Sequence, residues 1–248
     1  CGFMRVDSRR ICCRFLASQL QFLHRKKKFD YQSKAHPSVI RKEYEVSLPA
    51  LPEQRAIATA LSDADALIES LDRLIAKKRS IKQASMQQLL TGQTRLPGFT
   101  GEWETKRLGD IAEVLMGQSP SSVNYNLSGF GIPLIQGNAD VENRKPVKRI
   151  FTTHVTKKGK ARDILLTVRA PVGEVATTSF DICLGRGVCA LRYGNYWLYH
   201  YLVFIEPTWA KHSSGSTFDA VNSADVKSVR IKMPYESDEQ AAIATVLS

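Results

Sequence analysis

The stretch from Leu48 to Leu96 constrains the fold more than any other part of the sequence. Pro49 and Pro52 each restrict the preceding residue to extended geometry, and proline is tolerated in the first turn of a helix. No glycine or proline then occurs before Gly92, which supplies a helix stop. A continuous helix of this length would extend roughly 58 Å, at about 1.5 Å per residue. That is too long for an ordinary globular helix.

Apolar residues within this stretch recur at intervals of four and three residues, which is the spacing of a coiled-coil seam. The predicted partner-helix interface consists of Ile57, Leu61, Ala64, Ile68, Leu71, Ile75, Ile81 and Leu89. An amphipathic helix lying on a domain shows a similar stripe. Because of the length, we favour a rod at 48–96 that packs on a partner helix.

The start of this helix is repeated near the end of the chain. Segments 53–62 and 239–248 are identical at eight of ten positions, and a proline precedes each copy. This long period of 186 residues (53 to 239) indicates repeated domains rather than a short-unit solenoid. A fainter similarity aligns Phe15 with Trp197. We therefore predict that 1–47 is the C-terminal remnant of a first domain and that 235–248 begins a second, truncated helix.

The composition is that of a soluble globular protein, with 43% hydrophobic and 24% charged residues among 248. No apolar run approaches the roughly 20 residues needed to cross a bilayer, and no signal-peptide pattern occurs, so we expect a cytoplasmic location. The five cysteines form no CxxC pair. Cys183 and Cys189 lie in apolar, strand-like surroundings, which favours reduced core thiols over disulfides.

The charge favours a polyanionic partner, with nucleic acid ahead of membrane, because the net charge is +11 and the pI is about 9.5. Residues 1–47 carry eleven Lys/Arg against four acids. A second concentration of cations has no acid among them and consists of Arg144, Lys145, Lys148, Arg149, Lys157, Lys158, Lys160 and Arg162. A charge run is usually a solvated face, but eight uncompensated cations exceed what solubility requires.

The region 97–234 predicts an α+β domain with mixed or antiparallel strands and long loops. Strand-like runs broken by turn residues occur at Ile111–Leu115, Pro133–Gln136, Ile164–Val168, Val172–Thr177, Ile182–Leu184, Gly187–Leu191 and Val226–Met233. Helix-like runs occur at Tyr196–Ile205 and, in the first segment, at Phe15–Leu20. A polar loop is predicted at Ser213–Thr217.

Several motifs, in a fixed order, resemble those of one family. They are 49–58 (PALPEQRAIA), 108–120 (LGDIAEVLMGQSP), 135–140 (IQGNAD), 163–173 (DILLTVRAPVG), 185–187 (GRG) and 215–218 (GSTF). Over residues 40–248 the chain resembles the specificity subunit of type I restriction–modification systems. The first motif is similar to the conserved helical spacer of that family, and the others to a target recognition domain.

The resemblance implies two tandem recognition domains, each followed by a long helix, with the two helices antiparallel. Each domain would recognise one half of a split DNA sequence, and modification subunits bound along the helices would methylate it. Residues 97–234 then correspond to the second recognition domain. Opposite Gly215-Ser216-Thr217, the first segment has only Ser33-Lys34-Ala35. The implied partners are double-stranded DNA, the modification subunit, through it the restriction subunit, and a second copy through the helix.

Candidate DNA-binding residues combine cations for phosphates with polar groups for base edges. They are Gln118, Ser119, Gln136, Asn138, Arg144, Lys145, Lys148, Arg149, Lys157, Lys158, Lys160, Arg169, Arg186, Ser216 and Thr217. Glutamine and asparagine amides suit adenine, and arginine suits guanine. The alternatives are structural: Gln136 and Asn138 as turn caps, Arg169 in a buried ion pair, and Arg186 in a tight turn. Ser216 and Thr217 could also cap the next element.

Enzyme interpretations fit poorly. The histidines make no metal-binding spacing, and neither a P-loop nor a GxGxxG motif occurs. Met233-Pro234-Tyr235 is only faintly similar to the Asn/Asp-Pro-Pro-Tyr motif of amino-methyltransferases. We expect a non-catalytic DNA-recognition subunit without metal or cofactor. The alternatives are a truncated, DNA-silent fragment that only pairs helices and, more distantly, a methyltransferase.

Overall fold

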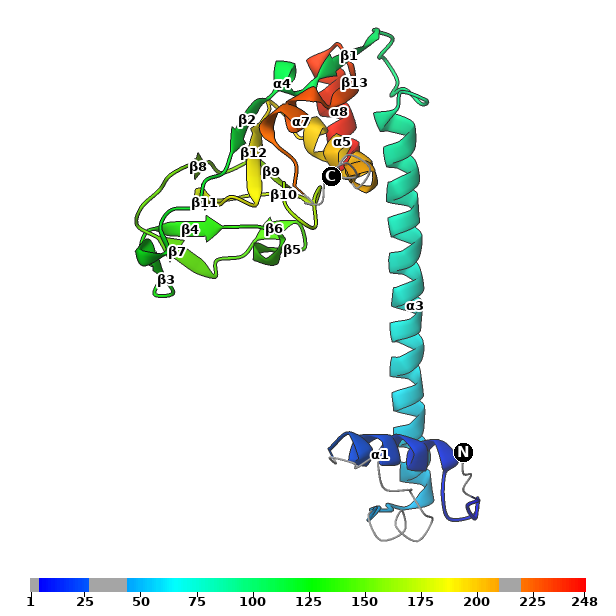
Figure 1. Ribbon diagram of the computed structural model, residues 1–248. Helices are drawn as coiled ribbons and strands as arrows, with labels where there is room; N and C mark the ends of the chain where they lie inside the picture. Colours follow the sequence, from blue (N-terminus) through cyan, green and yellow to red (C-terminus); the bar gives the residue numbers. More distant parts are fainter. Residues whose placement is uncertain (1–4, 27–43, 210–219) are drawn as a thin grey trace. The chain divides into compact units, whose positions relative to one another are not determined.

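The computed structural model describes residues 5–26, 44–209 and 220–248 (Figure 1). The chain divides into two compact units, 1–78 and 79–248. The predicted fold class is confirmed, because the chain combines a long helix with a mixed helix-and-sheet domain. Within the described residues, no helix is both long and apolar enough to cross a membrane.

The long helix is confirmed as α3 (Leu51–Leu90), which contains 40 residues. At about 1.5 Å per residue it extends roughly 60 Å. Pro52 lies in its first turn, where the missing N–H has no helical partner to lose. Gly92 follows the helix with φ +73°, a backbone conformation that glycine adopts without strain.

Unit 1 contains α1 (Cys13–Lys26) and the N-terminal part of α3, joined by a buried glutamine. Gln54 is 1% exposed, and its Oε1 accepts a hydrogen bond from the Cys12 N–H at 2.9 Å. Its Nε2 donates to the carbonyl oxygens of Arg10 (3.1 Å) and Pro49 (2.8 Å). Since an unpaired buried amide is costly, this network ties the segment before α1 to the start of α3.

The repeated glutamine of unit 2, Gln240, makes equivalent bonds. It lies in α8 (Ser237–Leu247), and its Nε2 donates to the Pro234 carbonyl at 2.9 Å. Its Oε1 accepts from the Tyr193 hydroxyl (2.6 Å) and the Asn195 amide (3.1 Å). Each copy of the repeat therefore uses one buried glutamine to fix a helix start to the segment preceding another helix.

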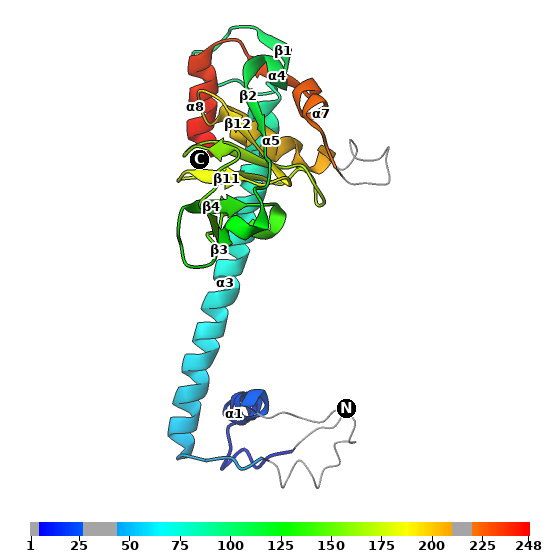
Figure 2. The ribbon, with the colours of Figure 1, turned by 60° about the vertical axis from the view of Figure 1, so that its left-hand side comes forward.

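Unit 2 is built from two sheets and two strand pairs (Figures 1 and 2). One sheet, ordered β10–β9–β12–β2, comprises β2 (Glu113–Met116), β9 (Ile164–Thr167), β10 (Val175–Thr177) and β12 (Val188–Arg192). The other, ordered β3–β7–β4–β11–β8, comprises β3 (Tyr125–Asn126), β4 (Ile132–Ile135), β7 (Ile150–Thr152), β8 (Lys158–Gly159) and β11 (Ile182–Leu184). Strands β4 and β11 pair in parallel, with Cys183 opposite Leu134, and the other described pairs are antiparallel.

The remaining elements complete the domain. The strand pairs are β1 (Trp103–Arg107) with β13 (Arg230–Pro234), and β5 (Val141–Glu142) with β6 (Lys145–Pro146). The helices and 3-10 turns are α4 (Leu108–Ile111), η1 (Ser122–Asn124), η2 (Asn138–Asp140), α5 (Trp197–Ile205), η3 (Glu206–Thr208), α7 (Ser223–Ser228) and α8. Because β1 pairs with β13, the beginning and the end of the domain lie side by side.

The core lies on both faces of the four-stranded sheet. In β12, Cys189 and Leu191 belong to the cluster that contains α5 and α8, whereas Val188 and Ala190 belong to the cluster shared with the five-stranded sheet. Successive strand residues point to opposite faces, so a strand buried on both sides needs an uninterrupted apolar sequence. This explains why the β9 and β12 runs show no polar alternation.

Three predicted strand boundaries were wrong. Residue Ile111 belongs to α4, so the first predicted strand starts at Glu113. Val172 and Gly173 form a turn, and β10 begins at Val175. The run predicted as a strand from Val226 is helical to Ser228, because the Asn222 side chain accepts hydrogen bonds from the Ala224 and Asp225 N–H groups in a capping box. The loop predicted at Ser213–Thr217 lies outside the described residues.

The boundary between the two compact units lies within the long helix. The division falls inside α3, between Lys78 and Arg79. The last turns of the helix belong to unit 2 because Met86, Leu89 and Leu90 are buried in its core. The last turns of α3 therefore share a core with the domain that follows them.

Candidate nucleic-acid interface

Three of the family-like motifs meet at one backbone junction, which we call the glycine junction and define as residues 117–119, 135–137 and 185–187. The Gly117 N–H donates to the Val188 carbonyl at 3.0 Å, and the Gly185 N–H donates to the Ile135 carbonyl at 2.7 Å. The Gln118 N–H donates to the Leu184 carbonyl at 2.8 Å. Segments far apart in the sequence are thus held together by main-chain hydrogen bonds.

Close backbone packing requires glycine at several positions of this junction. A Cβ added at Gly117 would lie 2.1 Å from the Gly185 carbonyl oxygen, and one at Gly187 would lie 2.1 Å from the Gln136 carbonyl oxygen. Both distances are far below van der Waals contact with backbone atoms. At Gly137 a Cβ would meet no heavy atom within 4 Å, so only some of the motif glycines serve the packing.

The junction carries several of the predicted DNA-binding side chains. Arg186 and Gln118 are exposed, and the Arg186 N–H donates to the Ser119 hydroxyl oxygen at 3.1 Å. Gln136 and Asn138 are half-buried, and the Gln136 N–H donates to the Asp140 carboxylate at 2.8 Å. Within the described residues the Asn138 side chain caps no turn, and the Gln136 contact uses its main chain.

Arg169 lies beside this junction and is exposed, so the alternative of a buried ion pair is wrong. The neighbouring Val168 N–H donates to the Gly187 carbonyl at 2.9 Å, and Arg169 forms an isolated β-bridge with Ala220. The structure thereby brings Gln118, Ser119, Gln136, Arg169 and Arg186 into one region. The predicted residues Ser216 and Thr217 lie outside the described residues.

Three of the predicted cations have acidic partners. Lys158 pairs with Asp181 at 2.8 Å, and this ammonium, together with the Ala161 N–H, holds the pKa of the Asp181 carboxyl below its ordinary value. Arg149 pairs with Glu142. Arg144 pairs with Glu206 at 2.7 Å and also donates to the Val175 carbonyl at 3.0 Å.

Arg144 is consequently a structural residue as much as a surface charge. Together with Asn143 it forms the turn between β5 and β6, with φ values of +62° and +50°. Its guanidinium is directed onto Val175 and Glu206, which is an arrangement the charge pattern alone did not indicate.

Four predicted lysines are exposed and form no salt bridge among the described residues: Lys145, Lys148, Lys157 and Lys160. The charge of Lys160 still contributes to the lowered pKa of the Asp181 carboxyl. The Lys148 ammonium lies 4.3 Å from the centre of the Phe180 ring, a cation–π contact that leaves the charge uncompensated. Lys157 follows Thr156, whose hydroxyl donates to the Gln118 carbonyl. It therefore lies next to the glycine junction.

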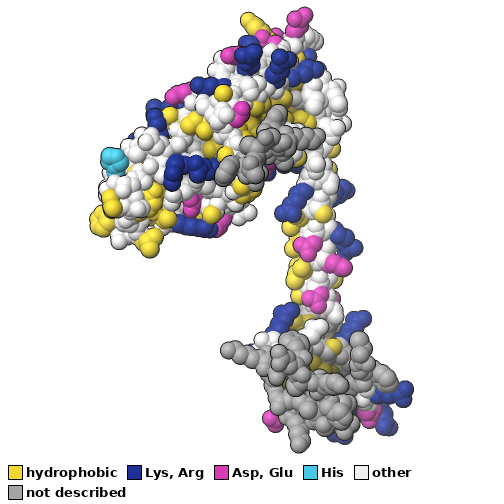
Figure 3. All heavy atoms as spheres, in the orientation of Figure 1, with side chains coloured by type: hydrophobic (Ala, Val, Ile, Leu, Met, Phe, Trp, Pro, Cys, Tyr) yellow, Lys and Arg dark blue, Asp and Glu magenta, His cyan; other side chains and the backbone are white. Residues whose placement is uncertain are grey.

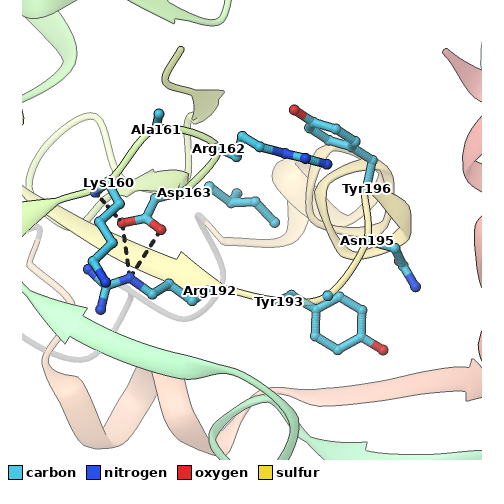
Figure 4. A pocket seen from close by; sticks show the side chains of 10 residues that line it. Lys160, Ala161, Arg162, Asp163, Arg192, Tyr193, Asn195 and Tyr196 are labelled. Carbon is cyan, nitrogen blue, oxygen red and sulfur yellow. Dashed lines mark hydrogen bonds and ion pairs between the residues drawn. The ribbon is translucent and has the colours of Figure 1, made fainter. Parts of the chain in front are cut away.

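A pocket between β9, β12 and the start of α5 joins Lys160 and Arg162 to Arg192 and Tyr193, which the sequence did not single out (Figure 4). Arg192 donates to the buried Asp163 carboxylate at 3.1 Å and to Glu113 at 2.9 Å. Across the pocket, the Arg162 guanidinium lies 5.6 Å from the centre of the Tyr196 ring. The Arg192 charges are balanced within the domain, so this cluster braces the strands.

The predicted helix interface is exposed over most of its length. Ile57, Leu61, Ala64, Ile68, Leu71, Ile75 and Ile81 all lie on the surface, and a line of hydrophobic side chains runs along α3 (Figure 3). Leu89 does not fit this interface, because it is 7% exposed and packs in the core of unit 2. The seam available to another helix therefore ends before the last turns of α3.

Sequence reasoning missed an exposed apolar surface of unit 2, carried by η1 and by the turn that follows β3. We call it the apolar tip and define it as Val123, Leu127 and Phe130, which are 85%, 81% and 70% exposed. Figure 3 shows hydrophobic side chains gathered at the β3 end of unit 2, with Lys and Arg side chains on the same face. The signal was available in the sequence as apolar residues within a turn-rich segment.

Two buried titratable groups of unit 2 have strongly shifted pKa values. Burial lowers the pKa of His200 to about 4 and raises that of Cys189 to about 12, so both are neutral at pH 7. Cys183 and Cys189 are fully buried free thiols, as predicted. Among the described residues, no group of His, Cys, Asp and Glu side chains is arranged to hold a metal ion.

The fold and the junction define a loop-rich recognition domain carried on a long helix, the architecture of restriction–modification specificity subunits. A family model described as the type I restriction modification DNA specificity domain matches residues 100–248. The chain belongs to this family, as the sequence motifs indicated.

Relatives and solved structures agree. The MjaX and MjaIX type I restriction enzyme specificity subunits of Methanocaldococcus jannaschii are each 33% identical, over 82% and 63% of this chain. The chain covers 51% and 39% of them, about half the length of such relatives or less. The HsdS subunit from Thermoanaerobacter tengcongensis is 31% identical, with a TM-score of 0.59 over 95% of this chain and 59% of that one.

Two further structures show the same fold. One belongs to a study of complex assembly and conformational transition of the type I restriction–modification system. It is 30% identical, with a TM-score of 0.63 over 98% of this chain and 64% of that one. The S subunit from M. genitalium is 16% identical, with a TM-score of 0.68 over 98% of this chain and 67% of that one, and is evidence for the fold alone.

Proposed function

We propose that this chain recognises DNA sequence as part of a type I specificity subunit and binds one half-site of a bipartite target. The observation that carries the proposal is the glycine junction, which places Gln118, Ser119, Gln136 and Arg186 together at the surface. Amide and guanidinium groups can distinguish adenine and guanine in the major groove. The unpaired lysines supply phosphate contacts and therefore affinity.

The domain organisation follows the same proposal. Residues 1–47 are the tail of a first recognition domain, 48–96 the spacer helix, 97–234 the second recognition domain and 235–248 the start of a second spacer helix. The equivalent hydrogen bonds of Gln54 and Gln240 support this, since each fixes a helix start to the segment that precedes an earlier helix.

The chain acts by binding alone. The exposed stripe of α3 docks a modification subunit or another spacer helix, and the restriction subunit joins through the modification subunit. The methylated adenine is flipped into the pocket of that partner, since base chemistry requires removal of the base from the stack.

A second candidate is a DNA-silent assembly fragment that only pairs helices. The specific observation in its favour is the exposed stripe, in which Leu67 and Ile68 are 60% and 59% exposed on unit 1. Exposed apolar stripes of this kind mark protein interfaces.

Selection of bound duplexes from a random pool, with the purified chain and a modification subunit, distinguishes the two. We expect a short motif enriched on one side of a gap, and binding that weakens steeply with salt. Absence of duplex binding at low ionic strength, while helix-mediated assembly persists, would contradict DNA recognition and support the assembly fragment.

A further inference from the structure

The apolar tip is held in a defined conformation. The Asn126 side chain accepts a hydrogen bond from the Phe130 N–H at 3.0 Å and donates to the Phe130 carbonyl at 2.9 Å. Strand β3 pairs with β7, with Asn126 opposite Phe151. The turn is thus closed at both ends, and its hydrogen bonds fix Leu127 and Phe130 in solvent.

The backbone around Phe130 is equally constrained. Gly131 has φ +86°, and a Cβ there would lie 2.0 Å from the Thr152 carbonyl oxygen. Only glycine fits this position. The close approach of the two segments therefore sets where Phe130 is presented.

The apolar tip is continuous with the glycine junction. Segment 117–131 starts in the junction and ends in the tip, and the Tyr125 hydroxyl donates to the Pro120 carbonyl at 3.0 Å. Thr156 contacts Gln118, and the unpaired Lys157 follows it. A molecule that covers both the tip and the junction would consequently lie beside the unpaired Lys157, which favours a polyanion over an apolar protein surface.

We propose that the apolar tip packs against the bases of the duplex that the glycine junction binds, with Leu127 and Phe130 as the contacting side chains. This inference rests on the proposed DNA recognition. Leucine and phenylalanine contact thymine methyl groups in a groove or wedge between base steps. The contribution is apolar, so it differs from the lysine contacts in releasing no counterions.

The test measures duplex binding by the Leu127→Ala and Phe130→Ala variants. Fluorescence anisotropy reports the binding over a series of salt concentrations, with a modification subunit present. Each variant is expected to bind about tenfold more weakly, with an unchanged dependence on salt. Phe130→Leu should retain most of the affinity. The matched control is Tyr235→Ala, because Tyr235 is an aromatic residue with 71% exposure at another surface of unit 2.

The other outcomes overturn the inference. If wild type binds the duplex and the tip variants bind equally well, the tip proposal fails while DNA recognition stands. If the variants instead lose association with the modification subunit, the tip is a protein-docking surface. If wild type binds no duplex at any salt concentration, DNA recognition itself has failed and the tip proposal with it.

Discussion

Two adjacent lysines of the basic segment should differ in their contribution to DNA binding. Lys158 is paired with Asp181 at 2.8 Å, whereas Lys157 is exposed and has no acidic partner in the part of the chain that the structure describes. Each phosphate contact made by a cation changes the slope of log K against log salt by about 0.9. Lys157→Ala should therefore reduce the slope by about 0.9, and Lys158→Ala should change it much less.

The magnitude is measurable. When the salt concentration rises from 50 mM to 200 mM, a slope smaller by about 0.9 means that the affinity falls by a factor roughly 3.5 times smaller than for wild type. Fluorescence anisotropy with a labelled duplex across this range gives both slopes. Asp181→Asn is the complementary variant, because it frees the Lys158 ammonium and should steepen the dependence on salt.

The result that would refute the reasoning is a larger loss of slope for Lys158→Ala than for Lys157→Ala. Both side chains lie on the surface, so neither substitution should unfold the domain, and thermal melts of the two variants check this. Equal slopes for both variants and wild type would also exclude this segment from the phosphate contacts.

Three further predictions concern stability, measured by urea unfolding. Glu239 is 1% exposed and accepts hydrogen bonds from Arg95 at 2.6 and 2.8 Å, so Arg95→Ala should cost about 3–5 kcal/mol by leaving a buried charge unpaired; a loss below about 1 kcal/mol would contradict this. Burial, with a smaller effect of a nearby lysine, lowers the pKa of His200 from 6.5 to about 4. As the pH falls, His200 is therefore protonated in the unfolded state before it is protonated in the folded state. Stability should then decrease by about 3 kcal/mol between pH 6.5 and 4, and His200→Gln should remove this part of the pH dependence. Gly187→Ala should destabilise unit 2 by about 1–3 kcal/mol or more, whereas Gly137→Ala, which meets open space, should change little.

The long helix was predictable because its signals are local. Two prolines before the start, an interval free of glycine and proline, and Gly92 after the end specify α3 to within a few residues. The doubly buried strands β9 and β12 were predictable for the same reason, since apolar runs bounded by turn residues mark them.

The errors arose where tertiary contacts or a short cap decide the structure. The pairing of β1 with β13 joins residues more than a hundred positions apart, and no pattern in Trp103–Arg107 indicates it. By contrast, the capping box at Asn222 was a local signal that a strand-like apolar run obscured. Ion pairing is equally non-local, which is why Lys157 and Lys158 look identical in the sequence.

The candidate interface combines both kinds of information. Its glycines are visible as sequence motifs, but the reason for each glycine is a close backbone contact that the sequence does not show. The Gln136 carbonyl oxygen packs against Gly187, and the Gly185 carbonyl oxygen packs against Gly117. Such packing couples the loops, because a shift of one segment moves the carbonyl against which the next is placed. On the proposed DNA recognition, we therefore expect a change of DNA specificity to come from side-chain replacements at Gln118, Gln136 or Arg186 that leave these backbone contacts intact. We predict that substitution of these side chains, with the glycines of the junction kept, alters the target sequence without loss of the fold.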